Sequence, residues 1–293
     1  MRFSYAEAMC DPTFFAPLAK AAEEAGFTTF LVPDSVIYPE TSDTRYPYAE
    51  GGDRRFLENK PFLEPFSIIP ALGAVTEKIR FATFVMKLPI RSPVLVAKSV
   101  SSVAVLTGER FSFGVGTSPW PEDFAACGEE WTTRGRRTDQ MIAIIRGLLT
   151  GEFFEFHGQD YDIPSIKICP VPARPVPILI GGHADAALKR AARIGDGWMH
   201  AGGDPAELSA CLKRLQALRK EYGRENVPFE IHASSLDGFN VDGIKRLEEM
   251  GVTDVVVGFR DPYMRRSDTQ PLAEKIELLR AYAENVMHKV GVG

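Results

Sequence analysis

Acidic, hydroxyl and imidazole side chains follow short apolar segments of this chain, where they could hydrogen-bond a ligand or exchange protons with it. Asp34 and Ser35 follow the second apolar segment, Glu7 follows the first, and His200 ends the sixth. Asp34 could hydrogen-bond a ligand, Ser35 and His200 could donate a proton, and Glu7 could act as a general acid or base. The structural alternatives are a loop brace, a surface carboxylate and a hydrogen-bonded core histidine.

A glycine-rich segment follows the fourth apolar stretch and ends in two hydroxyl side chains. Gly116 lets the backbone approach a flat ligand, and Thr117 and Ser118 could donate to that ligand. The segment does not fit a dinucleotide-binding fingerprint, because the third glycine is absent and no helix begins within it. It also lacks the Gly-x-Ser-x-Gly spacing of a lipase-like nucleophile. A tight structural turn is the alternative.

A second glycine pair, Gly181-Gly182, leads through His183 into a helix-like stretch. Bare amide groups before a helix form a site for an anion such as phosphate. A tight strand–helix turn explains the same residues without a ligand. Trp198, in the next apolar segment, is either a core residue or a platform beside this turn.

Eight short apolar strands, each followed by a helix-like stretch, must position these residues. Parallel strands that are buried on both faces appear in a sequence as short apolar runs. Their alternation with helices predicts a TIM (β/α)8 barrel with its site in the loops after the strands. A doubly wound open sheet is the alternative. The strands are expected near Arg2–Ala6, Thr29–Val32, Phe81–Val85, Phe111–Val115, Val176–Ile180, Gly197–His200, Phe229–Ala233 and Asp254–Val257.

Two insertions interrupt this single domain of residues 1–293. The first, residues 36–61, is too long for a simple connection and is expected to cover the site. The second, residues 151–175, begins as a predicted hairpin and continues as an extended segment rich in proline. Ordinary surface loops are the alternative for both.

The remaining features concern partners and location. The net charge of −5 gives no basic footprint for nucleic acid, and no apolar run is long enough to span a bilayer. Isolated cysteines and the absence of a visible secretory signal predict a cytosolic protein. Arg136, in a basic cluster before a helix, could hold an anionic cofactor tail. The helix 94–106 is apolar or small on nearly every face, which predicts a homodimer.

Taken together, these segments resemble the bacterial-luciferase-like oxidoreductases, especially the branch that uses the deazaflavin coenzyme F420. The resemblance covers most of the chain and depends on the order and spacing of its motifs. These are residues 21–27 leading to Val32-Pro33-Asp34, residues 79–93, residues 108–116, residues 177–182, residues 191–193 and residues 195–198.

The resemblance implies a barrel with a tricyclic ring at its C-terminal mouth. Family members often carry a non-proline cis peptide at the end of strand three, which here corresponds to Phe84-Val85, followed by Met86. Gly116, Thr117 and Ser118 would flank the ring. The turn at residues 181–183 would bind the phosphate, with Trp198 near it.

One departure concerns the direction of the reaction. Several deazaflavin-dependent oxidisers of alcohols and sugar phosphates carry a histidine base directly after the aspartate of strand two, where this chain has Ser35. A serine is a poor base near neutral pH, so reduction of a small organic substrate is favoured, with Ser35, Tyr5 or His200 as donor. FMN with a monooxygenase reaction is the alternative cofactor. A non-catalytic flavin-binding protein and a metal-dependent hydrolase are the alternatives of other classes; no metal ligand set is predicted.

Overall fold

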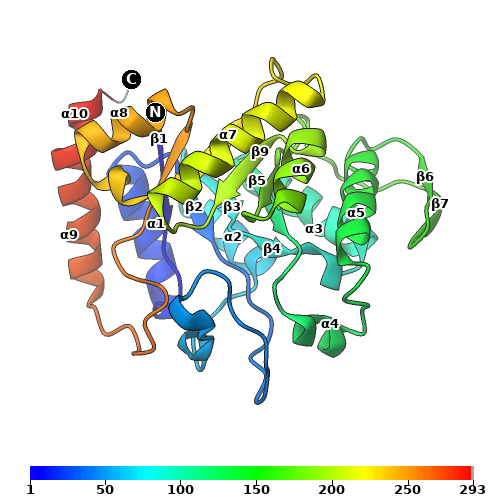
Figure 1. The fold of residues 1–293 in the computed structure, drawn as a ribbon, viewed down its shortest axis with the longest axis horizontal. Coiled ribbons are helices and arrows are strands. Elements are labelled where there is room, and N and C mark those ends of the chain that lie inside the picture. The colour runs from blue at the N-terminus through cyan, green and yellow to red at the C-terminus, as the bar shows by residue number, and fades with distance from the viewer. Residues whose placement is uncertain (292–293) are drawn as a thin grey trace.

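Eight parallel strand positions close into a barrel in the computed structural model, which describes residues 1–291 (Figure 1). The order β3-β2-β1-β11-β10-β9-β8-β5 is completed by pairing between β3 and β5, so the predicted barrel is confirmed and the open sheet is excluded. The strands are β1 (Arg2–Ala6), β2 (Thr29–Val32), β3 (Arg80–Thr83), β4 (Met86–Lys87), β5 (Phe111–Gly116), β8 (Ile178–Gly181), β9 (Gly197–His200), β10 (Glu230–Ser234) and β11 (Asp254–Val257).

The third strand position differs from the prediction. The sequence indicates one strand over residues 81–85, whereas the structure breaks the chain between β3 and β4 at Phe84-Val85. The peptide bond between these two residues is cis, as the family resemblance implies. β3 pairs with β2 and β5, and β4 pairs with the C-terminal half of β5 alone.

Helices cover the outside of the barrel, as Figure 1 shows. Several begin as the sequence predicts: Asp204 Oδ1 accepts a hydrogen bond from the Ala206 amide at 2.9 Å, with Pro205 in the first helical position. The helices are α1 (Phe15–Glu24), α2 (Pro65–Gly73), α3 (Pro93–Leu106), α4 (Pro121–Cys127), α5 (Arg134–Leu148), α6 (Asp185–Ile194), α7 (Pro205–Glu221), α8 (Val241–Glu249), α9 (Leu272–Tyr282) and α10 (His288–Val290).

Both insertions lie outside the barrel. The predicted hairpin forms as the antiparallel strands β6 (Phe154–His157) and β7 (Asp162–Ile166), at one edge of the molecule in Figure 1. The segment after β2 contains only two short 3-10 turns, Glu50–Gly52 and Arg55–Leu57. Among residues 1–291, no helix has both the length and the apolar character to cross a membrane.

Candidate functional site

A cavity of about 430 Å³ opens at the C-terminal mouth of the barrel. This volume lies within the range of about 300–1,000 Å³ that is usual for small-molecule sites. Each of the eight strand positions contributes lining residues at or just beyond its C-terminal end. The predicted site residues that line the cavity are Glu7, Asp34, Ser35, Phe84, Val85, Met86, Gly116, Thr117, Ser118, Gly181, Gly182 and His183.

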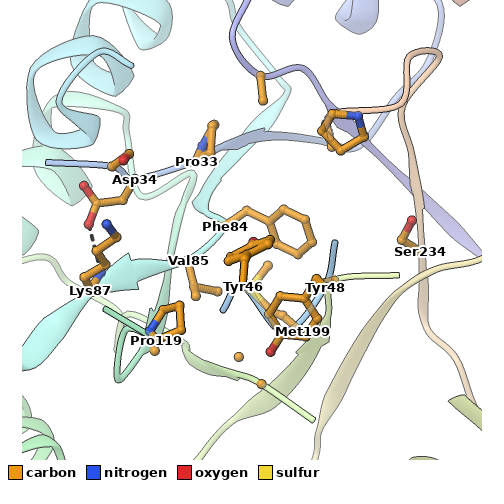
Figure 2. Close-up of a pocket in the computed structure, with 18 of the residues that line it drawn as sticks. Pro33, Asp34, Tyr46, Tyr48, Phe84, Val85, Lys87, Pro119, Met199 and Ser234 are labelled. Atoms are coloured by element: carbon orange, nitrogen blue, oxygen red, sulfur yellow. Dashed lines mark hydrogen bonds between the residues drawn. The ribbon is translucent and has the colours of Figure 1, made fainter. Parts of the chain in front are cut away.

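The floor of the cavity depends on Val85, which lies between two glycines. A Cβ atom added to Gly116 would lie 2.9 Å from a γ-methyl of Val85, and one added to Gly181 would lie 2.8 Å from the other. Both distances are shorter than a carbon–carbon contact allows. The two glycines are therefore needed so that Val85 can lie between β5 and β8. Figure 2 shows Phe84, Val85 and Met199 around this pocket.

The turn after β8 is held open by hydrogen bonds from the next strand. Gly182 has a φ of 113°, which side chains of L-residues rarely allow, and its carbonyl accepts a hydrogen bond from Trp198 Nε1 at 2.8 Å. His183 Nδ1 lies 3.1 Å from Glu207 Oε1, and its Nε2 accepts from the Ala201 amide at 3.1 Å. Burial lowers the pKa of His183 despite Glu207, so the imidazole is neutral near pH 7.

Asp34 lines the cavity but braces two strand ends. Its carboxylate accepts hydrogen bonds from the Lys87 amide at 2.8 Å, marked in Figure 2, and from Arg91 at 3.0 Å. The sequence leaves open whether Asp34 binds a ligand or braces a loop, and the structure shows the brace. Ser35, the next residue, lines the cavity and is half-buried.

A buried ion pair between β4 and α4, which sequence analysis missed, holds the loop after β5. Ser118 has a φ of 58° and donates a hydrogen bond to Asp123 Oδ2 at 2.7 Å. The same oxygen lies 2.8 Å from Lys87 Nζ, and the Lys87 side chain lines the cavity. A lysine within the otherwise apolar run 84–90 was the available signal. Asp123 thus holds the Ser118 hydroxyl and the Lys87 ammonium group at the cavity wall between β4 and α4.

Glu7 lines the cavity, and its carboxylate is oriented by two buried partners. It is 6% exposed, and its Oε2 accepts hydrogen bonds from the Tyr5 hydroxyl at 2.7 Å and from Lys275 Nζ at 3.2 Å. The predicted donor Tyr5 is fully buried and is committed to Glu7.

Three predicted site residues lie away from the cavity lining. His200 is fully buried behind His183, and burial together with that neighbour lowers its pKa to about 4, so it carries no proton to donate as an imidazolium. Trp198 is fully buried and contacts two lining residues, Gly182 through its Nε1 and His183 through an edge-on ring contact. Arg136 is held by both oxygens of Asp160 at 2.7 Å on the outer surface. Its predicted role in holding a cofactor tail finds no support in this placement.

The first insertion forms the roof of the site, as predicted. Tyr46, Tyr48 and Phe56 line the cavity, and Tyr46 stacks on Trp120 with ring centroids 5.4 Å apart. Tyr48 contacts the His183 ring at 4.8 Å. The interior of the cavity is therefore mostly aromatic and apolar, with few polar groups at its edges.

A cluster of His183, His200 and Glu207 has the composition of a metal site but not its geometry. The two imidazole rings stack with centroids 4.2 Å apart and planes inclined by only 8°. A metal ion lies close to the plane of each imidazole that binds it at about 2.0–2.1 Å. Two nearly parallel planes at this separation share no such position.

This chain matches a protein family and is similar to several known proteins. A family model described as luciferase-like monooxygenase matches residues 4–236. An uncharacterised protein of Mycobacterium tuberculosis (strain ATCC 25618 / H37Rv) is 59% identical over 290 residues, covering 99% of this chain and all of that protein. The FMNH(2)-dependent dimethylsulfone monooxygenase of Pseudomonas putida is 31% identical over 65% of this chain and 48% of its own length.

Two other proteins named for the deazaflavin coenzyme are similar. The F420-dependent glucose-6-phosphate dehydrogenase of Tsukamurella paurometabola is 26% identical over 83% of this chain and 65% of its own length. The crystal structure of coenzyme F420-dependent tetrahydromethanopterin reductase from Methanopyrus kandleri superimposes with a TM-score of 0.75, at 15% identity and 99% coverage of both chains. This last similarity concerns the fold.

Proposed function

Because this chain belongs to the luciferase-like monooxygenase family, we propose that it is an oxidoreductase that binds a tricyclic flavin-type cofactor at the barrel mouth. The cofactor proposed first is coenzyme F420, and the reaction is hydride transfer between it and a small organic substrate. The observation that carries the proposal is the cavity floor, where Val85 lies between Gly116 and Gly181 without a Cβ on either side. The apolar side chain of Val85 and the absence of a Cβ on either side would let a planar ring approach the backbone here.

The residues around the floor fit such a group. Gly116, Thr117 and Ser118 would flank the ring, and the turn at residues 181–183 would bind the phosphate through backbone amides. Bound there, the cofactor supplies or accepts the hydride. The protein excludes water with its aromatic roof and holds the substrate beside the floor in a reactive orientation. Ser35 is a poor base near neutral pH, so reduction of the substrate is favoured over oxidation.

The choice between F420 and FMN depends on the relatives. The relative named for F420 matches 83% of this chain, whereas the relative named for FMN matches 65%. The broader match supports F420, whereas the higher identity, 31% against 26%, belongs to the relative named for FMN. Arg136, proposed for the F420 tail, is paired with Asp160. FMN with a monooxygenase reaction is the second candidate.

Titration of the purified apoprotein with F420 and, separately, with FMN tests this order. We expect F420 to bind with micromolar or better affinity and FMN to bind at least ten-fold more weakly, read from quenching of cofactor fluorescence. Tight FMN binding without F420 binding would reverse the order. Binding of neither would remove the cofactor proposal. A carrier without catalysis would bind F420 but leave its reduced form unoxidised by an added quinone such as 1,4-naphthoquinone.

We also propose that α3 forms a homodimer interface. Leu95 is 69% exposed and Leu106 is 66% exposed on this helix, so the predicted burial on all faces is incomplete within one chain. We expect light scattering to give the mass of two chains, and Leu95→Glu with Leu106→Glu to give the mass of one. Leu236→Glu, at a 78% exposed position on another element, is the control and should leave the mass unchanged. A monomeric wild-type protein would refute the interface.

A further inference from the structure

The acidic and basic side chains that line the cavity are each paired with a group of opposite sign behind its wall. Among residues 1–291 the lining contains four such side chains, and none of their partners is itself a lining residue. The pairs, with their nitrogen–oxygen distances, are Glu7 with Lys275 at 3.2 Å, Asp34 with Arg91 at 3.0 Å, Lys87 with Asp123 at 2.8 Å, and Arg260 with Asp268 at 3.5 Å. Each pair is neutral as a unit, whether its proton lies on the base or on the carboxylate.

The other titratable side chains of the lining carry no charge near pH 7. Burial lowers the pKa of His183, so its imidazole is neutral. Burial also raises the pKa of Tyr46, that of Tyr48, and that of Tyr263 to about 12, so these three hydroxyl groups keep their protons. In the part of the chain that the structure describes, the cavity wall therefore offers no uncompensated charge to a ligand.

Three segments of the chain contribute to one aromatic cluster at the cavity, which consists of Tyr46, Phe56, Trp120 and Tyr263. Tyr46 stacks on Trp120 with ring planes inclined by 6°, and Phe56 meets Tyr263 edge to face with ring centroids 5.2 Å apart. The centroids of Tyr46 and Tyr263 are 5.8 Å apart, which joins the two halves. An aromatic ring packs well on such a cluster. A cation binds over the face of a ring, and Tyr46 and Trp120 each turn one face towards the other.

We propose that the substrate is an uncharged molecule with an aromatic ring, that it packs against the aromatic cluster, and that the four ion pairs make the cavity reject charged molecules. An ion that enters the cavity loses its water shell and finds no free counter-charge, whereas a neutral molecule loses far less hydration. That this ligand is the substrate rests on the proposed function. The binding preference depends on the cavity alone.

Benzamide, benzoate and benzamidinium test the binding preference, because they have nearly the same shape but are neutral, anionic and cationic near pH 7. Each is titrated with the full-length apoprotein in phosphate buffer, so that phosphate and not the probe occupies the amide turn at residues 181–183, and the NMR signals of the probe report binding. We expect benzamide to bind at least about ten-fold more tightly than either ion.

Three results of this titration would overturn the proposal. Benzoate that binds as tightly as benzamide would reveal a free positive charge in the wall. Benzamidinium that binds as tightly as benzamide would show that the aromatic cluster accepts a cation. Absence of detectable benzamide binding would show that the cavity does not take an uncharged aromatic molecule.

Two substitutions test whether the ion pairs set this preference. Asp268→Asn removes the carboxylate beside Arg260, whose buried Nη1 makes no hydrogen bond within residues 1–291 and whose guanidinium group stays charged in proteins. We expect this variant to bind benzoate at least about five-fold more tightly than the wild-type protein does. Asp123→Asn, which removes the partner of Lys87, should act in the same direction and provides the measurement if the first variant does not fold.

The matched control is Asp162→Asn, at an 82% exposed position in the hairpin insertion, which should keep the wild-type affinities for all three probes. If the folded variants at positions 268 and 123 gain no affinity for benzoate, the ion pairs do not cause the preference and the proposal is wrong.

The assignment of this ligand class as the substrate is tested with protein loaded with reduced F420, using acetophenone and 4-acetylbenzoate, while the absorbance of the cofactor is followed. In each reaction the hydride passes to the carbonyl carbon, the carbonyl oxygen takes a proton from water, and an alcohol and oxidised F420 are formed. We expect kcat/KM for acetophenone to be at least about ten-fold higher than for 4-acetylbenzoate. Equal or reversed values, or turnover of neither ketone, would overturn the substrate assignment. Failure of the wild-type protein to bind F420 would instead count against the proposed function and leave the benzamide result unchanged.

Discussion

Replacement of Gly181 or Gly116 by alanine is expected to weaken cofactor binding by ten- to a hundred-fold. The added Cβ would lie 2.8–2.9 Å from the γ-methyl groups of Val85, and a β-branched side chain has few rotamers with which to avoid the contact. The open space beside Val85 is the cavity. The added methyl group would therefore push the Val85 side chain into the position proposed for the ring. A fluorescence titration of each variant with F420 measures the loss.

The matched control is Gly135→Ala on α5, where the nearest atom to an added Cβ is Arg190 Nη2 at 3.5 Å, an ordinary contact. This variant should bind F420 as the wild-type protein does. All three variants should keep the far-ultraviolet circular dichroism of the barrel. If Gly181→Ala and Gly116→Ala both bind F420 with wild-type affinity, the proposed position of the ring is wrong.

Loss of Glu230 is expected to produce the largest change in acid stability. This carboxylate lies at the N-terminal end of the barrel, opposite the cavity, where its Oε1 is 3.3 Å from both Arg2 and Arg80 and its Oε2 is 3.0 Å from His232. Burial would raise its pKa, but His232, Arg80 and Arg2 outweigh burial and lower it to about 2. Glu230→Gln should lower the free energy of unfolding at pH 7 by roughly 3 kcal/mol.

The sign of the pH dependence follows from the lowered pKa. Glu230 stabilises the folded protein fully above the unfolded-state value near 4.5, and this contribution is lost as the pH falls towards about 2. Urea unfolding at a series of pH values should therefore show the wild-type and Glu230→Gln curves converging near pH 2. Glu277→Gln, at a 70% exposed position, should change stability by less than about 0.5 kcal/mol. A constant gap between the wild-type and Glu230→Gln curves down to pH 2 would show that this carboxylate is not the cause.

The barrel, and the end of it that carries the site, were predictable from the sequence because both depend on local patterns. A buried parallel strand such as β8, Ile178–Gly181, reads as consecutive apolar residues, and the polar residues that follow each strand gather at one end. The covering role of residues 36–61 followed from their length and position. The break at Phe84-Val85 was implied by family resemblance alone, because the apolar run 81–85 itself reads as one strand.

The placements at the site that the sequence did not reveal concern residues whose contacts depend on distant partners. His200 ends a strand as a proton donor would, but its side chain points behind His183 into the barrel wall. Arg136 is paired with Asp160, which is contributed by the hairpin insertion and is 24 residues away. The support of Glu7 by Lys275 joins residues separated by 268 positions, a distance over which no sequence pattern carries information.

The roof and the floor of the cavity come from different kinds of chain segment. The floor belongs to strand ends that also close the barrel, whereas Tyr46, Tyr48 and Phe56 belong to a segment that contributes no strand. Substitutions in that segment leave the barrel hydrogen bonds intact, so natural or engineered variation can reshape the roof of the cavity while its floor stays constant. Exchange of residues 36–61 between relatives is thus a direct route to new ligand selectivity on one barrel.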